Sequence, residues 1–101
     1  MNTIETLPKS LECGGDTYFL SMYITAWDMY CICYKGMEKD EHGDRNTILS
    51  VVVEDNRPDK PQYEIPDDIN TIAVAIDLDD AVRITRIRIN KKFKSILRYS
   101  D

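Results

Sequence analysis

Apolar and polar residues alternate along three segments in the first half of the chain, residues 17–25, 29–35 and 47–54. A period of two that is rich in aromatic and β-branched side chains is typical of strands with one buried face. A shorter first strand is expected within residues 4–13, because the turn sequence Gly-Gly-Asp follows it and glycine tolerates the positive φ angles of tight hairpins. The pattern therefore predicts a small antiparallel meander of three to four strands.

The apolar period changes in the last third of the chain. The tripeptide Pro-Asp-Asp at residues 66–68 is a helix-start signal, since proline fits the first turn and acidic side chains favour the positive end of the helix dipole. Apolar residues then recur at helical spacing, at Ile69, Ile72, Ala73 and Ile76. We therefore predict a helix through this segment. A strand over residues 71–78 is the alternative, because threonine, isoleucine and valine also occur there.

From Asp79 onward the sequence predicts a second helix, or a continuation of the first, with acidic residues at its front and basic residues toward its end. One apolar stripe on this helix comprises Val82, Ile89, Phe93, Ile96 and Leu97. Ile84 and Ile87 fall on the other side of the helical wheel, so we expect them to face outward. A bulged strand over residues 82–89 is the alternative interpretation.

The whole chain, residues 1–101, is expected to form a single α+β domain, with one or two C-terminal helices packed on one face of the sheet. A hydrophobic fraction of 43% and a charged fraction of 31% are typical of globular proteins. No apolar run approaches the length of a membrane span, and the first residues do not resemble a signal peptide. We therefore expect a cytoplasmic protein that does not bind membranes.

Charge is divided unevenly along the chain. Residues 1–80 contain 6 Lys/Arg and 17 Asp/Glu, a balance of −11. Residues 81–101 contain 7 Lys/Arg and 1 Asp, a balance of +6. The sequence thus describes an acidic body with a basic C-terminal segment.

Three cysteines and one histidine, Cys13, Cys31, Cys33 and His42, could supply the ligands of a structural zinc ion, but their spacing follows no metal-binding motif. Cys31 and Cys33 lie two residues apart in a predicted strand, so they share one face without facing each other. Small buried thiols in a reducing compartment are the simpler interpretation. We expect no metal and no cofactor.

Clusters of acidic residues raise the question of catalysis, since paired carboxylates can act as acid and base or hold magnesium. Asp67 with Asp68, and Asp79 with Asp80, already have an explanation as helix starts. No phosphate-binding glycine loop, dinucleotide fingerprint or catalytic triad accompanies them. The sequence therefore favours a protein that is not an enzyme.

A basic helix could contact the phosphates of a nucleic acid through Arg83, Arg86, Arg88, Lys91, Lys92, Lys94 and Arg98. The acidic body would repel the same polyanion, so DNA and RNA are expected to bind weakly. An acidic surface that imitates nucleic acid is a further option.

Binding of another protein is the leading functional interpretation. Isoleucines flanked by arginines on the outer face of a helix, and a high density of tyrosine and tryptophan between residues 18 and 34, are both typical of interfaces. The candidate partner-binding residues are Ile84, Ile87, Arg83, Arg88, Lys91, Trp27 and Tyr23. Size and charge suit an inhibitor or adaptor, including one from a mobile genetic element, and self-association as a homodimer is also an option.

Overall fold

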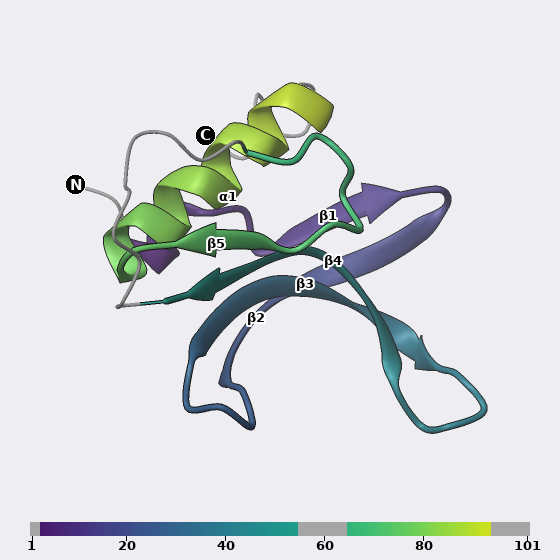
Figure 1. Cartoon of the computed structure of the whole chain (residues 1–101). Helices are drawn as coiled ribbons and strands as arrows, with labels where there is room; N and C mark the ends of the chain where they lie inside the picture. Colours follow the sequence, from purple (N-terminus) through teal and green to yellow (C-terminus); the bar gives the residue numbers. More distant parts are fainter. Residues whose placement is uncertain (1–2, 55–64, 94–101) are drawn as a thin grey trace.

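Five strands and one long helix make up the computed structural model, which describes residues 3–54 and 65–93 (Figure 1). In chain order the elements are a short 3-10 helix η1 (Ile4–Thr6), β1 (Ser10–Cys13), β2 (Asp16–Ile24), β3 (Tyr30–Lys39), β4 (Arg45–Val53), β5 (Ala73–Ala75) and α1 (Leu78–Lys92). The strands form one sheet in the order β1-β2-β3-β4-β5. The structure confirms the α+β class and the strands expected in the first half of the chain.

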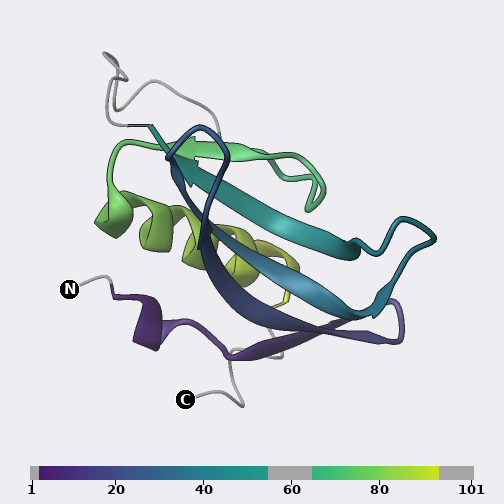
Figure 2. The same cartoon turned by 90° about the horizontal axis from the view of Figure 1, so that it is seen from below.

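The sheet differs from the predicted meander in strand number and direction. Strands β1 to β4 are joined by successive antiparallel hairpins, but β5 pairs with β4 in parallel, through Val51–Ala73 and Val53–Ala75. The result is a mixed sheet of five strands rather than an antiparallel sheet of three to four. The sheet curls, and α1 lies on one side of it while the concave side of the curl faces away from α1 (Figures 1 and 2).

The helix predicted after Pro66 is wrong. The Asp68 carboxylate accepts a hydrogen bond from the Asn70 backbone N–H, and the Thr71 N–H donates to the Asp68 carbonyl, so these groups close a turn. The chain then extends into β5, which agrees with the alternative strand interpretation. The helix-start signal of this segment therefore marks a turn before a strand.

The core lies between α1 and the sheet. Large side chains from three strands, among them Leu11, Tyr34 and Leu49, pack with Val82 and Ile89 from the helix, and all of them are almost completely buried. The Tyr34 hydroxyl donates a 2.7 Å hydrogen bond to the Pro8 carbonyl, so this buried polar group has a partner. Burial raises the pKa of Tyr34, which keeps its hydroxyl protonated.

Helix α1 begins where the sequence predicts and excludes the bulged-strand alternative for residues 82–89. Val82, Ile89 and Phe93 are buried, as expected, whereas Ile96 and Leu97 of the predicted stripe lie outside the described residues. The outward orientation expected for Ile84 is wrong, because this side chain is 0% exposed, and Ile87 is half-buried.

The reason is that the buried face of α1 is wider than its apolar stripe. Val82 and Ile84 lie about 160° apart around the helix axis, and both are buried. Thr85 and Arg88 fall between them on the buried face, where the Thr85 hydroxyl donates to the Ala81 carbonyl. The Thr85 hydroxyl and the two terminal nitrogens of Arg88 have hydrogen-bond partners in these core positions, whereas the buried Arg88 Nε has none.

Candidate functional site

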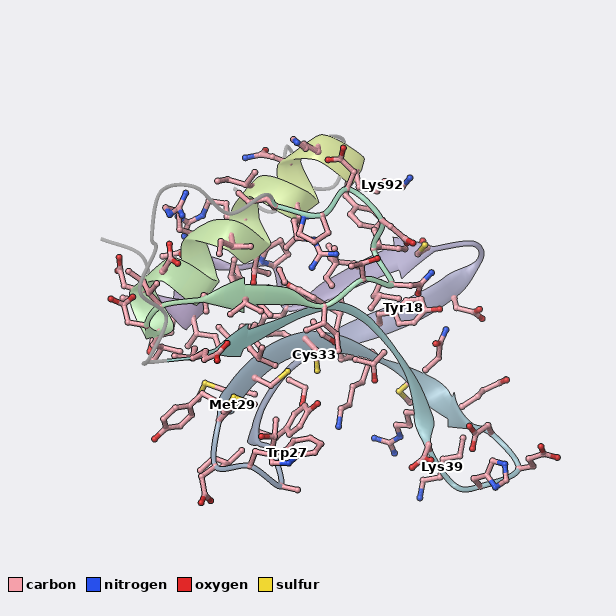
Figure 3. The ribbon with its side chains drawn as sticks, in the orientation of Figure 1. Tyr18, Trp27, Met29, Cys33, Lys39 and Lys92 are labelled. Atoms are coloured by element: carbon pink, nitrogen blue, oxygen red, sulfur yellow. The ribbon has the colours of Figure 1, made fainter. Side chains whose placement is uncertain are left out.

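The candidate residues from the sequence fall into two separate groups. Trp27 and Tyr23 belong to the β2–β3 hairpin, whereas the five residues of the C-terminal segment belong to α1, which packs on the opposite side of the sheet (Figures 1 and 3). The structure therefore does not bring the two groups into one site.

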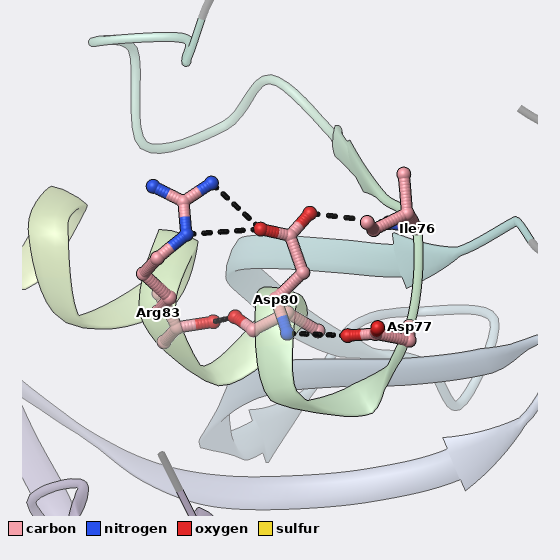
Figure 4. Close-up of polar contacts among 6 residues, drawn as sticks. Ile76, Asp77, Asp80 and Arg83 are labelled. Atoms are coloured by element: carbon pink, nitrogen blue, oxygen red, sulfur yellow. Dashed lines mark hydrogen bonds and ion pairs between the residues drawn. The ribbon is translucent and has the colours of Figure 1, made fainter. Parts of the chain in front are cut away.

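The arginine nearest the start of α1 is engaged within the chain. The Asp80 carboxylate, whose residue is only 8% exposed, accepts hydrogen bonds from Nε and Nη2 of Arg83 at 2.9 and 2.6 Å and from the Ile76 N–H at 3.1 Å (Figure 4). Asp77 caps the helix by accepting a 2.7 Å bond from the Asp80 N–H. Arg83 therefore helps to fix the β5–α1 junction.

Other cations of α1 also contact groups of this chain. The Lys91 ammonium lies 3.0 Å from the Asp67 carboxylate, and Arg86 donates to the Thr6 hydroxyl. The basic character of the segment thus serves, at least in part, to pair the helix with the rest of the domain.

Arg88 lies in the core, with 3% of its surface exposed. Its guanidinium donates to the backbone carbonyls of Ser50, Asp68 and Thr71 at 3.2, 2.6 and 2.7 Å. Burial lowers the pKa of Arg88, because desolvation disfavours its charge. Through these hydrogen bonds, the Arg88 side chain of α1 links the segment before β5 to β4.

The β2–β3 hairpin holds its aromatic tip by local hydrogen bonds. The Thr25 N–H donates to the Met29 carbonyl, and the Thr25 hydroxyl accepts from the N–H groups of Trp27 and Met29. Asp28 adopts a left-handed conformation with φ of 61°, which short polar side chains tolerate best after glycine. The connection of residues 25–29 between β2 and β3 places Trp27 at the turn with 79% of its surface exposed.

A defined set of side chains lies on the concave side of the sheet, away from α1, and we call this surface the hollow face. Residues paired directly across strands share a face. The register therefore places on it Phe19, Ser21, Tyr23, Cys31, Cys33, Lys35, Lys39, Arg45, Thr47 and Val52. Figure 3 shows Trp27 reaching under the same curl, and Cys33 projecting from β3 toward it.

Aromatic and cationic side chains adjoin on the hollow face. The Lys35 ammonium lies 4.5 Å from the centre of the Tyr23 ring, within the range of a cation–π interaction. Lys35 lies next to the exposed rings of Phe19 and Tyr23, and the paired residues Lys39 and Arg45 continue the positive charge farther along β3 and β4. These cations were not predicted as site residues, although the odd-numbered positions of Lys35 and Lys39 in β3 match those of the cysteines.

The two cysteines of β3 lie at the floor of the hollow face. Both are buried, but neither belongs to the core cluster between sheet and helix. Hydrogen bonds from the Cys33 thiol and from Tyr23 lower the pKa of Cys31, and the same Cys31 contact raises the pKa of Cys33. The bond to Cys31 also raises the pKa of Tyr23 to about 12, so its phenol is neutral near pH 7.

We expect Cys31 and Cys33 of the native protein to resist alkylation while half-buried Cys13 reacts, because a reagent must reach the sulfur whatever its pKa. Iodoacetamide labelling followed by peptide mass spectrometry measures this difference. Labelling in denaturant, where all three thiols should react, is the control. Rapid native labelling of Cys31 would show that the side chains above it open readily.

Within residues 3–54 and 65–93, no three His, Cys, Asp or Glu side chains are grouped so that they could hold a metal ion. Over the same part of the chain, no helix is both long and apolar enough to cross a membrane. Comparison with known protein families, curated proteins and solved structures finds no match to this chain.

Proposed function

We propose that this domain is a non-catalytic protein-binding module, and that its hollow face receives an extended acidic segment of another protein. The observation that carries the proposal is the exposure of aromatic rings beside a line of cations on a sheet face that no described element covers. Exposed apolar patches of this kind are typical of interaction sites. Tyrosine, tryptophan and arginine are also the residues most enriched at binding hot spots.

Charge supports an acidic partner. The chain has a net charge of −5, yet Lys35, Lys39 and Arg45 gather on this face. Acidic side chains of a partner would neutralise them, and the surrounding negative charge of the domain would disfavour acidic segments elsewhere. The hydrophobic rings would supply affinity, and the cations would supply orientation and selectivity.

The face is also suited to strand-like ligands in shape. Side chains of an extended segment point alternately to opposite sides, so one side can contact Tyr23 and Trp27 while the other remains in water. We place the site here rather than on α1, because Ile84 and Arg88 are buried in the core and Arg83 is bonded to Asp80.

Trp27→Ala is expected to weaken binding of an acidic peptide by about tenfold or more, the range of a hot-spot residue. Peptides selected from a displayed random library against the intact protein serve as the probes, and calorimetry measures their affinity. Because Trp27 is largely exposed, its replacement should change the free energy of unfolding by no more than about 0.5 kcal/mol.

Leu78→Ala is the matched control, because Leu78 is an exposed apolar residue at the start of α1, on the other side of the sheet, and it should leave affinity unchanged. Affinity should also fall with salt concentration, since the ion pairs lie at the surface. Peptides that bind equally well to Trp27→Ala would contradict the proposed site. Tighter binding of single-stranded oligothymidylate than of any peptide, again dependent on Trp27, would instead identify a nucleic-acid-binding face.

A further inference from the structure

The outer edge of β2 is only partly covered. Strand β1 pairs with β2 from Asp16 to Phe19, and the Leu20 N–H donates to the Lys9 carbonyl at 3.0 Å. Beyond Leu20, no strand among the described residues lies on that side of β2. In an antiparallel ladder, the backbone groups of alternate residues point to the same side. Those of Met22 and Ile24 therefore point outward, as those of Leu20 do.

This open edge lacks the features that usually prevent strands from pairing. Proteins protect such edges with lysine, proline or bulges. Here the segment from Leu20 to Trp27 contains no ionisable charge at neutral pH and no proline. It instead exposes apolar side chains beside the edge, with Met22 46% and Ile24 59% exposed.

We propose that this edge binds a second copy of the same chain, through antiparallel pairing of β2 with β2 about a two-fold axis at Tyr23. In that register Met22 lies opposite Ile24 of the second copy, and both residues have outward-pointing N–H and C=O groups. Each such pair exchanges both of its hydrogen bonds. The register is therefore self-complementary in hydrogen bonding as well as in side chains.

The side chains agree with this arrangement on both faces. Met22 and Ile24 project to the α1 side of the sheet, where each covers its counterpart in the other copy. The two Tyr23 rings meet on the hollow side, so the hollow faces of the two chains join into one continuous surface. An uncharged edge favours a copy of itself, since it offers a charged partner no complementary group and two copies meet without local repulsion.

The Leu20 N–H already donates to the Lys9 carbonyl, so pairing with a second copy is limited to the residues beyond Leu20. Because a two-fold axis uses the same edge of both chains, the assembly closes as a dimer and does not extend through this edge. The short ladder makes the dimer dependent on the apolar contacts of Ile24.

Light scattering on the full chain across a concentration series tests this inference. The wild-type protein is expected to reach twice the mass of the chain. Ile24→Lys should raise the dimer dissociation constant by about tenfold or more, since lysine at a strand edge opposes pairing. Met37→Lys is the matched control, because Met37 is similarly exposed, at 64%, but lies in β3 away from this edge, and it should leave the dimer intact.

Amide hydrogen exchange gives a second readout, in which the Met22 and Ile24 amides exchange more slowly at high protein concentration. A protein that stays monomeric at every concentration overturns the inference. So does a dimer that Trp27→Ala weakens and Ile24→Lys leaves unchanged, because it would then form face to face. Neither result bears on the acidic-peptide measurement, so failure of the dimer and failure of the proposed function are distinguishable.

Discussion

Replacement of Arg88 by alanine is expected to lower the free energy of unfolding by about 3 kcal/mol or more, because each buried acceptor left without its donor costs about 1–3 kcal/mol. The variant leaves the carbonyls of Ser50, Asp68 and Thr71 without their buried donor. It also removes a side chain that fills space in the core. Urea-induced unfolding followed by circular dichroism measures the change.

Lys92→Ala is the matched control for this variant, because Lys92 is an exposed cation in the last turn of the same helix. Its effect should stay within about 0.5 kcal/mol. Arg88→Lys should remain substantially destabilised, since a single ammonium group cannot reproduce the forked geometry of a guanidinium. Equal stabilities of Arg88→Ala and Lys92→Ala would show that Arg88 does not hold the segment before β5 in place.

Ile84→Ala is expected to cost about 2–5 kcal/mol, the range for truncating a fully buried isoleucine. Ile87→Ala should cost clearly less, because Ile87 is half-buried on the same helix and loses fewer contacts. Thermal unfolding of both variants under identical conditions makes the comparison. If Ile87→Ala were the more damaging of the two, α1 would have to be rotated relative to the sheet.

The strands of the first half were predictable from their alternating side-chain types and their aromatic and β-branched residues, although burial does not alternate along them: residues 31–34 of β3 are all buried, and residues 22–24 of β2 are all exposed. Strand β5 gives no such signal, since it has only three residues and two of them are alanines. Its preceding Pro-Asp-Asp sequence resembles a helix start because turns and helix ends use the same side-chain-to-backbone hydrogen bonds.

The face of α1 that packs on the sheet could not be predicted from its apolar stripe. A polar residue can fill a core position when its hydrogen-bond partners are distant in sequence. Ser50 and Asp68 accept the hydrogen bonds of Arg88 across 38 and 20 residues. No local pattern records such partners, so Arg88 read as a surface cation and Ile84 as an outward residue.

The candidate site, like the fold, was only partly predictable from the sequence. Dense aromatic residues indicated that some rings remain outside the core, and Trp27 and Tyr23 are indeed exposed. The contact of Tyr23 with Lys35, and the position of both side chains inside the curl of the sheet, depend on the strand register. Register shifts between β3 and β4, with Leu49 in a left-handed conformation at φ 57°, set that curl. Leucine rarely adopts this conformation, so its position in the strand could not be read from residue preferences.

The parallel pairing of β5 with β4 has a consequence for the order in which the chain folds. Strands β1 to β4 meet through short turns, so each hairpin closes at little entropic cost. The β4–β5 ladder instead joins Val53 to Ala75, and its long connection must be closed before any of its hydrogen bonds can form. We therefore expect the four-stranded meander to form first, and β5 and α1 to dock onto it together, with the guanidinium of Arg88 joining them only in the final step.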